Sequence, residues 1–199
     1  MPRRPRVDAA RNRGAILSAA RDQITAHGPD VGMDEIAAFA GVAVGTLYRH
    51  FETKSALVAA VLDEYLVAIS NEAEEAAARV HEGASAGDEI AKFIRNMVDV
   101  SAANRAAKAV AISLGVSPDT KEVEVRTVRA ITKILKAGFS DGSIPKGVTF
   151  EDVYLVVQTA PYEQPRTSRE RWLNIILKGL LSSVAPGDKK KRAVPPSTI

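Results

Sequence analysis

Four polar side chains that can donate hydrogen bonds stand within five consecutive residues of this sequence: Thr46, Tyr48, Arg49 and His50. Together they supply donors for phosphate oxygens and for the edges of bases. We expect the Tyr48 hydroxyl to contact phosphate; a core position is the weaker alternative, because Leu47 already occupies the packing side. Arg49 is the best candidate for reading a base edge, since its planar fork matches guanine in the major groove. A solvated surface charge is the alternative for Arg49.

The neighbouring residues extend the same interpretation. Ala43, Val44 and Gly45 are small enough to let the backbone approach a groove, and Val44 could touch a thymine methyl group. They could equally be simple turn residues. Lys54 would open the next helix, where a cation opposes the helix dipole. A phosphate bound at that position would account for the lysine.

The elements that would position these groups form a helix-turn-helix over about residues 32–51. Residues 34–40 predict a short helix, because acidic residues at its start suit the helix dipole. Gly41 can adopt the positive φ that ends such a helix. The second helix would pack three apolar side chains inward: Val42, Leu47 and Phe51. Helices this short are unstable alone, so they need a scaffold.

The sequence offers no support for catalysis. Its three histidines, His27, His50 and His81, show no metal-ligand spacing, and it contains no phosphate loop, no serine elbow and no cysteine. Acidic pairs such as Asp63-Glu64 fit solvated helix faces. We therefore expect no catalytic residue, no metal site, no cofactor and no enzymatic activity.

Composition favours an all-α protein. The 199 residues are 46% hydrophobic but only 5% aromatic, with the apolar residues dominated by Ala, Val, Leu and Ile. The lack of cysteine fits a reducing compartment, and we expect a cytoplasmic protein. No apolar run approaches the roughly 20 residues of a membrane span, and the N-terminus lacks the apolar core of a signal peptide.

Positive charge is concentrated at the two ends of the chain. Residues 1–13 contain five arginines and one aspartate, and residues 186–199 contain three lysines and one arginine against one aspartate. The body between them has 18 basic and 22 acidic residues. Next to a helix-turn-helix, an N-terminal arm could enter a groove or neutralise phosphates through its arginines, Arg3, Arg4 and Arg6. The C-terminal run fits a solvated, disordered tail better.

Four segments follow from these patterns. We expect a flexible basic arm over residues 1–8, a DNA-binding domain over residues 9–54, a helical regulatory and dimerisation domain over residues 55–185, and a basic disordered tail over residues 186–199. Thr53 is a plausible cap for a long helix, and Thr149 with Asp152 resembles a capping box. Residues 153–160 are apolar nearly all round, which predicts a helix buried on several sides.

The motif closely resembles the tetracycline-repressor (TetR) family of bacterial transcription regulators. The residues that carry the resemblance are Ile36-Ala37, Ala40-Gly41-Val42, Gly45-Thr46-Leu47-Tyr48, Arg49, His50-Phe51 and Lys54. It covers roughly the first third of the chain, and it is specific because many spaced positions agree at once. Gly32 departs from the family pattern, which usually has Ser or Thr as the helix cap at this position.

The resemblance implies an N-terminal three-helix domain and a C-terminal helical domain for ligand binding and dimerisation. It implies that Thr46 and His50 are further phosphate ligands. It also implies that the last two helices form a four-helix interface with a second subunit, for which we predict contacts by Val153, Val157, Leu173, Ile176 and Leu180. Periodicity alone says only that these two helices are buried.

The resemblance is also the reason to expect an effector pocket. Its candidate lining is Tyr65, Phe93, Met97, Tyr154, Gln158, Tyr162 and Trp172, although each could be plain core. No charged cluster lies within an apolar stripe, so we expect a small hydrophobic effector that is neutral or weakly polar.

The function predicted is that of a sequence-specific DNA-binding regulator. We expect a homodimeric repressor that binds a palindromic operator in double-stranded DNA and is released by its effector, without any membrane partner. The alternatives are a constitutive architectural DNA-binding dimer and, less well supported, a helical enzyme or small-molecule carrier.

Overall fold

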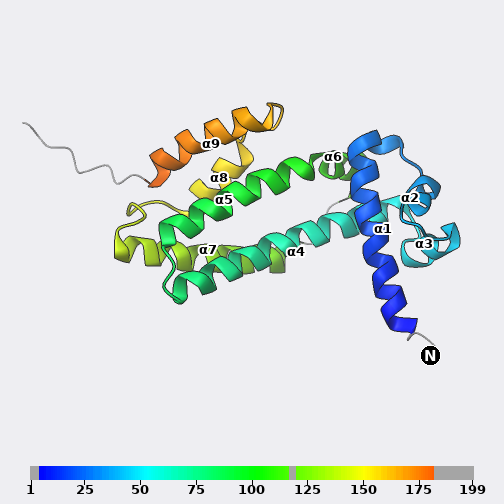
Figure 1. Cartoon of the computed structure of the whole chain (residues 1–199), viewed down its shortest axis with the longest axis horizontal. Coiled ribbons are helices and arrows are strands. Elements are labelled where there is room, and N and C mark those ends of the chain that lie inside the picture. Colours follow the sequence, from blue (N-terminus) through cyan, green and yellow to red (C-terminus); the bar gives the residue numbers. More distant parts are fainter. Residues whose placement is uncertain (1–4, 117–119, 182–199) are drawn as a thin grey trace, which may run out of the picture.

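The computed structural model describes residues 5–116 and 120–181 (Figure 1). Within these ranges the chain forms nine α-helices and one short 3-10 turn, without a strand. A small group of helices, α1 to α3, lies at one end of the molecule. The long helix α4 leads from this group into a larger body made of the remaining helices.

The N-terminal group begins earlier than the sequence predicts. Helix α1 spans Pro5–His27, the 3-10 turn η1 spans Gly28–Asp30, α2 spans Met33–Phe39 and α3 spans Val44–His50. Residues 5–8, expected in a flexible arm, therefore belong to α1. Proline suits this first turn because its missing N–H would have no helical partner there.

Helix α2 starts and ends as the local sequence predicts. Gly32 is its N-cap, and the Glu35 carboxylate accepts a hydrogen bond from the Gly32 N–H at 2.9 Å. A glycine has no side chain to cap the helix itself, so Glu35 supplies the polar contact at this end. At the other end, Gly41 adopts φ +67° and turns the chain toward α3.

Helix α4 spans Lys54–His81, and the predicted cap is present because the Thr53 hydroxyl accepts from the Ala56 N–H at 3.1 Å. The helices that follow are α5 (Ala86–Ala103), α6 (Arg105–Ser113), α7 (Lys121–Asp141), α8 (Phe150–Gln158) and α9 (Arg166–Leu181). The capping box predicted for α8 forms between Thr149 and Asp152. Gly142 ends α7 in the left-handed region.

The apolar side chains form two separate cores. The first core joins α1, α2, α3 and the first half of α4, and α6 adds Ala107, Val110 and Ala111 to it. The second core joins the second half of α4 with α5, α7, α8 and α9. Helix α8 contacts both α5 and α7, and α9 lies along α5 on the side away from α4 (Figure 1).

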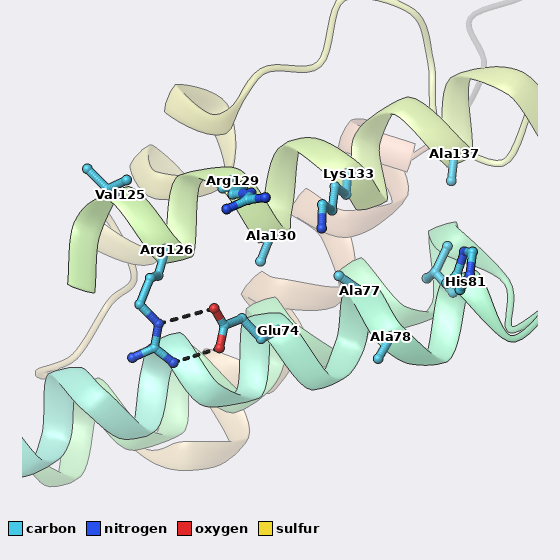
Figure 2. Close-up of a pocket in the computed structure, with 11 residues that line it drawn as sticks. Glu74, Ala77, Ala78, His81, Val125, Arg126, Arg129, Ala130, Lys133 and Ala137 are labelled. Atoms are coloured by element: carbon cyan, nitrogen blue, oxygen red, sulfur yellow. Dashed lines mark hydrogen bonds and ion pairs between the residues drawn. The ribbon is translucent and has the colours of Figure 1, made fainter. Parts of the chain in front are cut away.

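The most extensive helix packing in the larger body is between α4 and α7. Small residues such as Ala77 and Ala130 line both sides of it and leave an open groove of about 890 Å³ (Figure 2). Across this groove the Arg126 guanidinium donates to both carboxylate oxygens of Glu74, at 3.1 and 2.6 Å. This hydrogen-bonded guanidinium holds the pKa of Glu74 below its ordinary value.

Helix α8 differs from its prediction. Val153 and Val156 are buried in the second core, but Tyr154 and Leu155 are 55% and 58% exposed. A helix packed on one side of a layer must leave its opposite face open, whatever the residues on it. The expected burial on several sides is therefore wrong for the single subunit.

Gly138 occupies a position where α7 meets the loop that follows it. The glycine is buried, and the Ile144 side chain packs directly where a Cβ would stand. The Ile144 N–H also donates to the Gly138 carbonyl at 3.1 Å. Glycine costs a helix interior about 1 kcal/mol relative to alanine. Because Gly138 has no side chain, the fully buried Ile144 can pack directly against the α7 backbone.

We predict that Gly138→Ala destabilises the protein. The collision with Ile144 should cost about 1–3 kcal/mol, which exceeds the helix propensity that alanine gains. Gly14→Ala in α1 is the matched control, because its added Cβ would meet nothing within 4 Å and should leave stability equal or higher. Denaturant unfolding followed by circular dichroism measures both, and equal stability of the two variants would contradict the packing described for Gly138.

Candidate nucleic-acid interface

Helix α3 is held by its apolar face and presents its polar face outward. Leu47 is fully buried and Phe51, which follows the helix, is nearly so. Tyr48 is 44% exposed, and Arg49 is exposed beside it. The inward direction predicted for Leu47 and Phe51 is confirmed. The exposed phenol and guanidinium are therefore free to reach a duplex.

The other predicted contact residues of α3 also lie at the surface. Thr46 and His50 are half-buried, and Ala43, Val44 and Gly45 are exposed around the start of the helix. Of these last three residues, only Val44 has a side chain larger than a methyl group. The structure thus brings all seven residues between 43 and 50 that we predicted as contacts onto one short exposed element; their contacts with DNA remain predictions.

Sequence reasoning missed two side chains near this element. The Arg13 guanidinium of α1 lies 4.9 Å from the centre of the Phe51 ring, a cation–π contact that links α1 to the end of α3. Phe39 at the end of α2 is 60% exposed. Helical periodicity does not indicate this exposure, because Phe39 follows the buried Ile36 by three residues, a spacing typical of one helix face.

Lys54 has intramolecular partners that the sequence did not predict. It opens α4 as expected, but its ammonium donates to the carbonyl of Pro29 and, at 2.6 Å, to that of Val31. These carbonyls supply the negative partners that the sequence argument assigned to a phosphate. The ammonium joins the start of α4 to the segment before α2. A phosphate contact by Lys54 stays a prediction and would use the remaining N–H.

Most of the predicted basic arm lies outside the residues that the structure describes. Arg3 and Arg4 lie outside the described residues, and so does the side chain of Arg6. The C-terminal basic tail, expected over residues 186–199, lies outside them as well. The DNA contacts of the three arginines and the solvated character of the tail therefore remain expectations from charge alone.

A cavity of about 240 Å³ lies among α4, α5, α6, α7 and α8. Five of the seven predicted pocket residues line it: Tyr65, Phe93, Met97, Tyr154 and Gln158. The lining also contains Ser101 and Lys108, which the sequence did not single out. Ser101 continues the α5 face of Phe93 and Met97 at a spacing of four residues, so helical periodicity could have found it, whereas only the fold brings Lys108 of α6 to the cavity.

The other two predicted pocket residues have different positions. The Tyr162 hydroxyl donates to the Val157 carbonyl at 2.5 Å, and burial raises the pKa of this phenol above its ordinary value. Trp172 packs against the second core. Neither belongs to the lining of the cavity. For these two residues the alternative of plain packing fits the structure better.

The predicted dimer contacts divide into two sets. Val153 and Leu173 are buried inside the subunit, so they have little surface left for a second subunit. Val157, Ile176 and Leu180 are only partly buried. The apolar residues that face outward on α8 and α9 are instead Leu155 and Ile175, at 58% and 62% exposure. The exposed apolar surface of each helix therefore lies to one side of the contacts that we predicted, and the interface itself stays a prediction.

The described residues contain neither a metal-binding cluster nor a membrane-spanning helix. No group of three or more His, Cys, Asp or Glu side chains could hold a metal ion there. None of the helices in the same ranges has the length and apolar character needed to cross a membrane.

The two parts of the chain match two family models. Residues 16–61 match the model described as bacterial regulatory proteins of the tetR family. Residues 85–182 match the model described as the C-terminal domain of SbtR-like transcriptional regulators. The first match contains α2, α3 and the whole predicted recognition motif.

A solved structure of similar sequence extends over nearly the whole chain. It is the TetR transcription regulatory protein from Mycobacterium vanbaalenii, 32% identical, covering 89% of this chain and 99% of that one with a TM-score of 0.70. The regulator SCO0520 from Streptomyces coelicolor, at 24% identity, covers 86% and 99% with a TM-score of 0.65 and supports the fold.

A curated relative supports the N-terminal part. The HTH-type transcriptional regulator SAR0097 of Staphylococcus aureus (strain MRSA252) is 43% identical over 65 residues. This match spans 31% of the chain and about a third of that relative's length. Together these similarities indicate a transcription regulator rather than an enzyme. The chain belongs to the TetR family of bacterial transcription regulators.

Proposed function

We propose that this protein is a homodimeric repressor that leaves a palindromic operator when a small, largely hydrophobic effector binds. The observation that carries the proposal is the arrangement of one exposed polar helix and one internal cavity on a shared scaffold. Helix α3 packs on the first core, and the cavity lies beside the second. A regulator of chromosomal genes acts in the cytoplasm, where we expect this protein.

DNA binding follows from the exposed face of α3. Tyr48 supplies a neutral phosphate contact and Arg49 a bidentate donor for a guanine edge. Two subunits related by a two-fold axis would place two α3 helices in successive major grooves, about one helical turn of DNA apart or slightly more. The operator would then be palindromic, because the protein pair is symmetric.

Dimerisation follows from the open faces of α8 and α9. Leu155 and Ile175 are large apolar residues that solvent reaches in the single subunit. Helix α9 lies on the side of α5 away from α4 (Figure 1), and both side chains are already exposed, so a second copy could approach without disturbing either core. Pairing these faces would remove apolar surface from water, at about 25 cal/mol per Å² buried.

Two helices connect the cavity with the DNA-binding part. Helix α4 lines the cavity with Tyr65 and begins at Lys54, which contacts the segment before α2. Helix α6 lines the cavity with Lys108 while its Val110 and Ala111 pack in the first core. An effector that prefers another position of these helices would change the spacing of the two α3 helices. Coupling of this kind amounts to about 1–3 kcal/mol.

Operator titration tests the proposal. Duplexes selected from a random library should converge on a palindrome, and a compound that raises the melting temperature of the protein should lower its affinity for that palindrome. Selection without any preferred sequence would contradict operator binding. Stabilising compounds that leave DNA affinity unchanged would instead favour a constitutive architectural DNA-binding dimer.

We predict that Tyr48→Phe weakens binding to every duplex to a similar extent. The substitution removes one neutral hydrogen bond to phosphate, which is worth about 1 kcal/mol, and it leaves the ring in place. Fluorescence anisotropy with the selected operator and with unrelated duplexes measures the effect. A loss confined to the operator would assign Tyr48 to base reading.

We predict that Arg49→Ala relaxes specificity at one position of each half-site, at a cost of about 1–3 kcal/mol on the preferred base. Binding to a panel of single-base operator variants measures this change. Arg129→Ala is the control, because Arg129 is an exposed arginine of α7 in the larger body. If the half-site preferences survive the Arg49 substitution, another residue reads that base.

We predict that Ile175→Arg converts the dimer to a folded monomer. The side chain is exposed in the subunit, so the fold tolerates the charge, whereas a paired interface would bury it without a partner. Ile112→Arg is the matched control, because Ile112 is an isoleucine of α6 with 80% exposure. Light scattering after size exclusion measures the mass; a dimeric Ile175→Arg protein would place the interface elsewhere.

A further inference from the structure

One group of residues in the cavity lining is polar and hydrogen-bonded. The Lys108 ammonium of α6 donates to the Tyr65 hydroxyl at 3.1 Å and lies 4.7 Å from the centre of the Tyr65 ring. The Tyr65 hydroxyl shares a hydrogen bond with the Ser101 hydroxyl at 2.8 Å. Tyr65 and Ser101 are both buried. A cation and two hydroxyl groups therefore meet on this part of the lining.

The rest of the lining is mostly apolar. Its large side chains include Ile69, Phe93, Met97, Phe150 and Val153, which come from α4, α5 and α8. These surfaces suit a hydrocarbon or aromatic body. The cavity lining thus combines apolar side chains with a group of hydrogen-bonding side chains.

Lys108 lacks an acidic partner within the described part of the chain. None of the carboxylates there lies within 4.0 Å of its ammonium, which donates instead to the neutral Tyr65 hydroxyl. Arg79 and Arg126, which are also partly buried, each pair with glutamates. Glu124 lines the same cavity, but it is exposed at the start of α7, where water can hydrate its carboxylate.

A half-buried ammonium beside apolar walls favours an anion in the cavity. Partial burial costs the ammonium some hydration, and a hydrogen-bonded counter-ion restores that loss. A lysine has three N–H donors, of which the Tyr65 hydroxyl takes one. The remaining donors can serve a carboxylate, and the Ser101 and Tyr65 hydroxyls can rotate to donate as well.

We propose that the effector cavity takes a small amphipathic carboxylate, with its apolar body against Phe93 and Met97 and its carboxylate on Lys108. This inference rests on the proposed ligand-responsive function and specifies the chemistry of its effector. It replaces the neutral effector expected from the sequence. That expectation came from searching single helix faces, whereas Lys108 belongs to a different helix from Tyr65 and Phe93.

Matched probes test the proposal on DNA-free protein. Octanoate and phenylpropionate are compared with octanol and phenylpropanol, which have similar apolar bodies but no charge. Thermal shift and calorimetry should show tighter binding of each acid. The acids should lose about tenfold to a hundredfold in affinity in Lys108→Met, the range expected for a hydrogen bond to a charged group, whereas the alcohols should change little.

Two further variants identify the cause of any loss. Lys108→Arg keeps the charge and should retain the preference for acids. Lys92→Met removes an exposed lysine of α5 outside the cavity lining and should leave all affinities unchanged. These binding results do not depend on any coupling between the cavity and DNA release. Failure of the proposed repression is therefore detected separately, by operator titration.

Three outcomes would overturn the proposal. They are equal binding of acids and alcohols by the unmodified protein, an acid preference that survives Lys108→Met, and an absence of acid binding up to millimolar concentration.

Discussion

Helix α4 has to bury a face in each of two hydrophobic cores, and the remaining helices are arranged around that requirement. Its first half contributes Leu57 and Val61 to the first core, and its second half contributes Ala73 and Ala76 to the second. The large residues pack among α1, α2 and α3, of which α2 and α3 are too short to be stable alone. The alanines let α7 approach closely along the second half. A continuous helix transmits a displacement at one end to the other, because its backbone hydrogen bonds resist bending between them.

The cavity lies beside the middle of α4, where this helix stops packing in the first core and begins to pack in the second. Tyr65 stands between these halves and belongs to neither core, and its hydroxyl turns to Ser101 and Lys108 instead of to apolar neighbours. Helix α6 shows the same division, since Val110 packs in the first core while Lys108 lines the cavity. The Tyr65 and Ser101 hydroxyls are buried at this boundary, but they hydrogen-bond to each other, which offsets the cost of burial beside walls that could hold an amphipathic molecule. The physical basis of the proposed coupling is therefore a shared pair of helices.

The roles of the cations in this protein depend on the groups that surround them. Lys54 donates to two backbone carbonyls and joins elements of the DNA-binding part. Arg126 is neutralised by Glu74 across the groove between α4 and α7. Arg13 lies over the Phe51 ring, and Lys108 has, among the residues that the structure describes, a hydroxyl and a ring but no carboxylate beside it. Residue type alone does not separate these four roles, since each cation could have been a solvated charge.

The sequence by itself determined the features that depend on near neighbours. Gly41 ends α2, Thr53 caps α4 and Thr149 pairs with Asp152, because each of these interactions closes within a few residues and needs no distant partner. The recognition motif could be located for the same reason, since α3 is short and its faces follow from helical periodicity. Only the tertiary structure decided which contacts join residues far apart. Lys54 and Val31 are separated by 23 positions and Lys108 and Tyr65 by 43, and the exposed face of α8 depends on which helices pack beside it. Local patterns carry no information about such partners, because the packing of whole helices brings them together.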